Sequence, residues 1–176
     1  MKNKNTILVF ITLLLLTISS RWVSHIWNFT LLGGAFLFAG AFFQDKKISV
    51  LLMLSSMLIS DFIIGFHDQM LSVYLSYLII VSLGFFLLPN SSRLRILSFS
   101  VLGSLSFYVL TNFAVWYQGE LYPLTFDGLI NCFTMAIPFY RNQILSDVIS
   151  SVAIFEAVKL MPGLVLVPNA AEVKTK

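Results

Sequence analysis

The chain has 176 residues, of which 58% are hydrophobic and 11% are charged, and its mean hydropathy is +0.90. Because a soluble domain carries about 25% charged residues, this composition excludes a soluble protein and predicts a single integral membrane domain over residues 1–176. The only cysteine, Cys132, excludes an internal disulfide framework, and the basic residues are too scattered to form a nucleic-acid-binding patch.

Apolar runs bounded by charged or turn residues predict about six membrane helices, and the absence of period-2 alternation excludes a membrane β-barrel. The predicted helices span residues 6–20, 29–43, 48–66, 70–88, 94–117 and 143–161. The first run is short, so we expect it to extend through Trp22 while Arg21 snorkels to the membrane surface. We interpret this run as a retained helix rather than a cleaved signal peptide.

The segment 126–140 has two interpretations. It is either a short interfacial or re-entrant helix in the last outer loop, or a seventh membrane crossing. Its length of about 15 residues and the interruptions at Asn131 and Pro138 favour the short helix. The sequence therefore predicts an all-α, polytopic membrane bundle with a C-terminal tail over residues 162–176.

The basic residues predict the orientation of this bundle. If six helices alternate from a cytoplasmic N-terminus, only Arg21 and Arg141 lie outside, and both termini are cytoplasmic. The inner side then holds Lys2, Lys4, Lys46, Lys47, Arg93, Arg95, Lys159, Lys174 and Lys176.

Carboxylates inside apolar runs need a physical reason, because each costs about 2.5–3.5 kcal/mol on insertion scales. Asp61 lies near the outer end of the third run, where Ser56 and Ser60 are one turn apart and form a polar face. The chain then leaves the membrane at His67. Asp61 either binds a ligand or forms an ion pair, with Arg141 as a candidate partner, or it caps its helix or bonds to another helix.

The last two long runs also carry polar residues at helical spacing. Tyr108, Asn112 and Trp116 lie on one face, where an amide between two aromatic rings is suited to a flat ligand, although helix packing explains the pattern equally well. Gln143, Asp147 and Ser151 repeat the spacing. Arg141 is expected to pair with Asp147 or to bind a ligand anion, and Glu156 is expected to pair with Lys159.

Most of these polar and aromatic residues map to the outer half of the predicted bundle, which favours an outward-facing pocket for a small water-soluble molecule. The candidate substrate-binding residues are Asn28, Asp61, His67, Tyr108, Asn112, Trp116, Asn131, Tyr140, Arg141 and Asp147. No catalytic or metal-binding motif is present, so the sequence predicts neither an enzyme nor a bound cofactor or metal.

Several strings resemble a little-characterised bacterial family of membrane transport proteins. They are Asn28-Phe29-Thr30 with residues 34–43, Ser60-Asp61-Phe62-Ile63-Ile64-Gly65-Phe66-His67, Val73-Tyr74, Thr111-Asn112-Phe113-Ala114-Val115-Trp116 and Ala136-Ile137-Pro138-Phe139-Tyr140. That family is similar in size and helix count to the substrate-binding (S) components of energy-coupling factor transporters. The resemblance implies a six-helix bundle of the bacterial cytoplasmic membrane that takes up a vitamin or a vitamin precursor.

The same resemblance implies a lipid bilayer, a small-molecule substrate, a scaffold membrane subunit and cytoplasmic ATPases as partners. S components usually carry Ala-x-x-x-Ala on the first helix for docking the scaffold, whereas residues 6–20 contain no alanine. The nearest match, Ala35 and Ala39, lies on the second run, where small residues allow close helix packing. The alternative to transport is a membrane structural or interaction protein without a ligand.

Overall fold

A computed structural model describes residues 2–23 and 28–161, and within these ranges it contains six α-helices and no strand. The prediction of an all-α fold is therefore confirmed. The helices are α1 (Lys2–Val23), α2 (Leu32–Phe42), α3 (Lys46–Ile64), α4 (Met70–Gly84), α5 (Arg93–Gln118) and α6 (Phe126–Lys159). The predicted tail, residues 162–176, lies outside the described residues.

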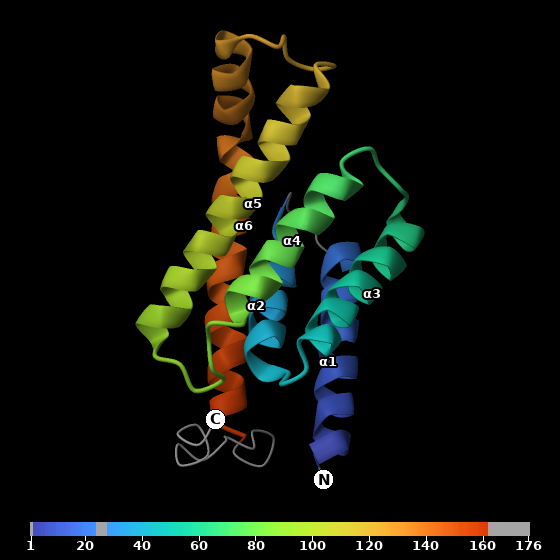
Figure 1. Cartoon of the computed structure of the whole chain (residues 1–176), viewed down its shortest axis with the longest axis vertical. Helices are drawn as coiled ribbons and strands as arrows, with labels where there is room; N and C mark the ends of the chain where they lie inside the picture. The colour runs from blue at the N-terminus through green and yellow to red at the C-terminus, as the bar shows by residue number, and fades with distance from the viewer. Residues whose placement is uncertain (1, 24–27, 162–176) are drawn as a thin grey trace.

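Successive helices run in alternating directions, so the start of α1 and the end of α6 lie at the same end of the bundle (Figure 1). The short helix α2 lies inside and packs against α4 and α6, while α1 packs mainly against α3. The hairpin formed by α5 and α6 extends beyond the other helices at the end opposite the chain termini (Figure 1).

The bundle has an apolar exterior and a partly polar interior. Large apolar side chains such as Phe62, Leu71 and Leu94 are exposed, whereas fourteen polar or charged residues of the described ranges, including Asp61 and Asp147, are buried. This distribution is the reverse of that in a soluble protein and suits helices surrounded by lipid. In the part of the chain that the structure describes, three helical stretches are long and apolar enough to cross a membrane, which makes a membrane location plausible. They are Lys4–Trp22, Lys46–Ile64 and Arg93–Gln118.

The second predicted helix is shorter than expected. Residues 29–43 were expected to span the membrane, but α2 has 11 residues and is about 16 Å long, about half the thickness of a bilayer core. It begins only after a turn at Asn28, whose φ is +58°. Its residues Leu32–Ala41 are all buried, so neighbouring helices cover it on every side.

The backbones of α2 and α4 are in direct contact at two glycines. A Cβ atom on Gly40 would lie 2.2 Å from the carbonyl oxygen of Val81, and one on Gly84 would lie 2.2 Å from the carbonyl oxygen of Leu37. Both distances are far below van der Waals contact, so only glycine fits. These glycines allow the buried α2 to pack closely against α4.

The segment 126–140 is not a separate short helix, nor a separate seventh crossing. It forms the first part of α6, a continuous helix of 34 residues that is about 51 Å long. Thr125 caps the start of α6, because its hydroxyl accepts a hydrogen bond from the Gly128 amide at 3.1 Å. Pro138 removes only one backbone donor, and within a bundle such a loss is tolerated because neighbouring groups bond the exposed backbone. The carbonyl group that loses its helical donor is that of Thr134. One residue earlier, the Tyr108 hydroxyl donates to the carbonyl oxygen of Phe133 at 2.6 Å, so α5 contacts the α6 backbone in this region.

Ionic contacts join α5 and α6 at the end that contains the chain termini. The expected pair of Glu156 with Lys159 is confirmed, with an O–N distance of 3.0 Å. Glu156 also pairs with Arg93 at 3.2 Å, and the Lys159 ammonium donates to the carbonyl oxygen of Ser91. These contacts hold the beginning of α5 against the end of α6.

The glycine contact predicts a difference between two alanine variants. Gly84→Ala should lower the free energy of unfolding by about 1–3 kcal/mol, because its Cβ would collide with a backbone carbonyl that cannot move alone. Gly103→Ala, on α5, meets only the Ile80 side chain at 3.2 Å and should change stability little. The measurement is thermal unfolding of the two variants in detergent; equal midpoints would contradict the close packing of α2 on α4.

Candidate functional site

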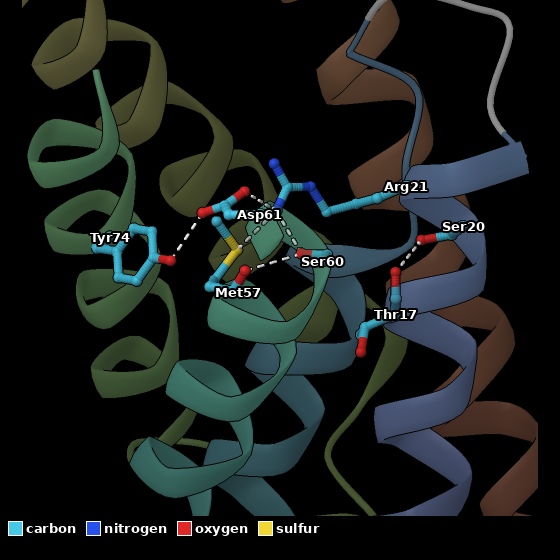
Figure 2. Close-up of polar contacts among 7 residues, drawn as sticks. All are labelled: Thr17, Ser20, Arg21, Met57, Ser60, Asp61 and Tyr74. Atoms are coloured by element: carbon cyan, nitrogen blue, oxygen red, sulfur yellow. Dashed lines mark hydrogen bonds and ion pairs between the residues drawn. The ribbon is translucent and has the colours of Figure 1, made fainter. Parts of the chain in front are cut away.

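A buried ion pair joins α1 and α3. The Asp61 side chain is 0% exposed, and its Oδ1 lies 2.5 Å from Nη1 of Arg21. Its Oδ2 accepts a hydrogen bond from the Tyr74 hydroxyl of α4 at 2.7 Å. The Arg21 guanidinium also donates to the Ser60 hydroxyl (Figure 2). Both carboxylate oxygens of Asp61 are therefore bonded within the protein.

This arrangement corrects two predictions. Arg21 does not snorkel to the surface, because its side chain is only 16% exposed and reaches across to Asp61 (Figure 2). The ion-pair partner of Asp61 is accordingly Arg21 and not Arg141. The reason is the pairing of α1 with α3, which brings an arginine near the end of one helix beside a carboxylate near the end of the other.

The predicted polar face of α3 is confirmed and packs against a matching face of α1. One turn before Arg21, the Thr17 hydroxyl donates to the Ser56 hydroxyl at 2.9 Å. Thr17 and Arg21 on α1 therefore meet Ser56 and Ser60 on α3 in register. Of the alternatives for Asp61, this geometry favours the interhelical bond.

A cavity of about 250 Å³ lies between α5, α6 and the segment that precedes α2. Four of the ten candidate residues line it: Asn28, Tyr108, Asn112 and Tyr140. The other lining residues are Thr111, Ala136, Phe139 and Gln143. The structure thus brings together part of the predicted site from three separate regions of the sequence.

The cavity offers aromatic faces beside amide groups. The rings of Tyr108 and Tyr140 lie 4.5 Å apart between centroids, with 33° between their planes. The Asn112 amide nitrogen donates to the Tyr108 carbonyl oxygen of its own helix at 2.7 Å, which leaves the side-chain oxygen as a hydrogen-bond acceptor. A flat polar molecule could contact both kinds of group at once.

Asp147 lies next to the cavity but deeper in the bundle, where it is 4% exposed. Its Oδ2 accepts a hydrogen bond from the Ser104 hydroxyl of α5 at 2.5 Å, and it is also bonded by the Gln143 side chain and the Gly33 amide. A Cβ on Gly33 would lie 2.0 Å from the Asp147 carboxylate. Glycine at the start of α2 therefore makes this contact possible, and Gln143 connects Asp147 to the cavity.

The expected pair of Arg141 with Asp147 does not form. Arg141 is exposed on α6, and none of the ion pairs among the described residues includes it. Six residues along an α-helix rotate a side chain by about 240°, so Arg141 and Asp147 lie on different faces of α6.

Three further candidates do not line the cavity. His67 and Asn131 are exposed, His67 between α3 and α4 and Asn131 on α6. The indole nitrogen of Trp116 donates to the Pro123 carbonyl oxygen at 3.1 Å, so Trp116 contacts the loop between α5 and α6. Although Trp116 has the predicted spacing from Asn112, it is one turn too close to the loop to reach the cavity.

Sequence reasoning left four lining residues out of the site. Thr111 and Gln143 are each three residues after a predicted tyrosine, so their helical spacing could have included them. Ala136 and Phe139 have ordinary apolar side chains and gave no signal. Among the residues that the structure describes, no three His, Cys, Asp or Glu side chains gather as a metal ion would need.

The Arg21–Asp61 pair predicts a large effect of a conservative change. Asp61→Asn should lower the free energy of unfolding by about 3 kcal/mol or more, because Arg21 would remain in the bundle without its counter-charge. Asp45→Asn is the matched control. Asp45 caps the other end of α3 by accepting from the Lys47 amide, and asparagine caps as well as aspartate.

Thermal midpoints of both variants in detergent, with Arg21→Met/Asp61→Asn as a third protein, test this prediction. The double variant should recover part of the loss, because it removes both charges together. A midpoint of Asp61→Asn equal to that of the wild type would show that the ion pair does not hold α1 to α3.

Comparison with known proteins completes the description of the site. No curated protein and no solved structure matches the chain. A family profile matches residues 1–169, which include every helix and every residue that lines the cavity. The chain therefore belongs to the family described as "Family of unknown function (DUF6580)".

Proposed function

We propose that this chain is a multi-pass membrane protein that binds a small water-soluble compound and serves as the capture subunit of a transporter. The observation that carries the proposal is the cavity between α5 and α6, with the paired rings of Tyr108 and Tyr140 and the side-chain amides of Asn112 and Gln143. Its volume of about 250 Å³ equals that of about eight water molecules, which suits a compound of vitamin-precursor size.

The position of the cavity along its two helices supports a site near one membrane face. Tyr108 is 15 residues, or about 22 Å, from Arg93, and Tyr140 is 19 residues, or about 28 Å, from Lys159. Arg93 and Lys159 belong to the charged end of the bundle. Since the bilayer core is about 30 Å thick, a cavity at this height would be near the opposite face.

Charge asymmetry supports a cytoplasmic location for both termini. Lys46 and Lys47 begin α3, and Arg93 and Arg95 lie in the first turn of α5, whereas Arg21 lies near the end of α1. The starts of α3 and α5 are at the same end of the bundle as the chain termini, and the end of α1 is at the other (Figure 1). Basic residues favour the cytoplasmic side. With six alternating helices in a bacterial cytoplasmic membrane, the cavity would then open toward the outside, where a capture subunit meets its substrate.

Coupling to an ATPase module through a scaffold subunit follows from the resemblance to S components, and such a scaffold would need a docking surface. Ala35 and Ala39 cannot supply it in this bundle, because both are fully buried in α2. A scaffold subunit would therefore have to contact other residues on the outer helices.

The proposed binding function predicts that the full-length protein retains or binds a small molecule. Native mass spectrometry of the detergent-solubilised protein, incubated with a mixture of water-soluble vitamins and precursors, should reveal a bound species. Tyr140→Ala should weaken its binding by about 1–3 kcal/mol, because the substitution removes one of the paired rings. Tyr117→Ala, at an exposed tyrosine of α5 outside the cavity, should not.

Absence of any bound small molecule, or equal affinity of the wild type and Tyr140→Ala, would instead favour a structural or interaction protein without a ligand.

The proposed topology predicts the behaviour of reporter fusions. Green fluorescent protein fused after Lys176 should fluoresce, and alkaline phosphatase inserted at Glu120, between α5 and α6, should be active, because that loop would face outward. Phosphatase activity in a fusion after Lys176 would contradict an even number of crossings from a cytoplasmic N-terminus.

A further inference from the structure

Among the described residues two carboxylates are buried, Asp61 and Asp147, and their partners differ in charge. Asp61 is paired with the Arg21 guanidinium at 2.5 Å. The groups that donate to Asp147 are neutral: the Ser104 hydroxyl, the Gln143 amide and the Gly33 backbone amide. Removing a carboxylate from water costs much more when no positive charge compensates it. Asp147 therefore lacks the positively charged partner that compensates Asp61.

The described basic residues do not supply the missing charge. Arg21 is paired with Asp61, and Arg93 and Lys159 are paired with Glu156 at the other end of α6. Arg141, the nearest arginine along α6, is exposed on another face of that helix. The start of α2 contributes a partial positive charge of about one half through Gly33, which compensates the carboxylate only in part.

Asp147 does not itself line the cavity, but the cavity comes close to it at Gln143. Gln143 lines the cavity and is also bonded to Asp147, one helical turn of about 5.4 Å along α6. Tyr108 and Tyr140 also line the cavity, and aromatic rings attract organic cations. An anionic molecule in the same place would meet the carboxylate with no described basic side chain among the residues that line the cavity.

We infer that the compound bound in this cavity is a small, flat organic monocation whose positive charge is balanced by Asp147 and whose ring packs against Tyr108 and Tyr140. This inference rests on the proposed binding function and specifies its substrate class. Gln143 acts as a positioning residue that connects the carboxylate to the cavity, and Asn112 offers an acceptor for a hydrogen-bond donor of the ligand.

Three probes have nearly the same shape and the same number of non-hydrogen atoms but differ in charge: benzamidinium, benzamide and benzoate. Comparing them distinguishes the effect of ligand charge on affinity from the effect of ligand shape. Their affinities for the full-length protein in detergent are measured by calorimetry or by the shift in thermal midpoint. Benzamidinium should bind at least about tenfold more tightly than benzamide, and benzoate should bind weakest.

Two variants identify the charge responsible. Asp147→Asn should reduce the preference for benzamidinium over benzamide to about one, since asparagine keeps the shape and removes the charge. Glu156→Gln makes the same change of charge on the same helix, outside the cavity, and should keep the wild-type preference. The comparison of the three probes on the wild-type protein remains decisive even if Asp147→Asn does not fold.

The outcomes distinguish this inference from the proposed function. Equal binding of benzamidinium and benzamide, tighter binding of benzoate, or an Asp147→Asn protein that keeps the preference overturns the cationic ligand. If a compound still binds in the native mass spectrometry experiment and Tyr140→Ala weakens it, the binding function survives. If none of the probes and none of the compounds in the mixture binds, both are contradicted.

Discussion

The close contact of α2 with α4 and α6 is the constraint on which the rest of the bundle depends. Gly40 and Gly84 bring the backbones of α2 and α4 together, and Gly34 lies against Ser150 and Ser151 of α6. Because α2 is about half as long as a bilayer core is thick, its stability comes from burial among the other helices. The same close approach places the first turn of α2 against Asp147, beside the cavity.

The two buried carboxylates join different helices and have different partners. Breaking the Arg21–Asp61 pair would leave two uncompensated charges in an apolar interior, so α1, α3 and α4 are firmly joined at this point. Between α5 and α6 the contacts are of several kinds: the Arg93–Glu156 ion pair near the chain termini, and hydroxyl bonds of Ser104 with Asp147 and Ser100 with Ser151. Polar bonds between membrane helices average about 0.6 kcal/mol, so each hydroxyl bond contributes less than the buried ion pair.

The sequence predicts the helices and single faces well, because apolar periodicity and i,i+4 spacing are local properties. The polar face at Ser56 and Ser60 and the pair of Glu156 with Lys159 are examples that the structure confirms. The partner of Asp61 could not be predicted, because it depends on which helix packs against α3. Likewise, Pro138 suggested a break in the helix, but α6 continues through it. Trp116 has the spacing of a site residue, but its indole nitrogen is bonded to the loop at Pro123. Contacts between residues of different helices therefore cannot be predicted from local sequence patterns.

The cavity lies apart from the Arg21–Asp61 pair and is lined by other parts of the bundle. Its lining comes from α5, α6 and the residues before α2, and not from α1, α3 or α4. A molecule bound there would contact Tyr108 and Tyr140, while the Arg21–Asp61 pair holds α1 to α3 elsewhere in the bundle. Binding would thus require little reorganisation of the apolar exterior that faces lipid.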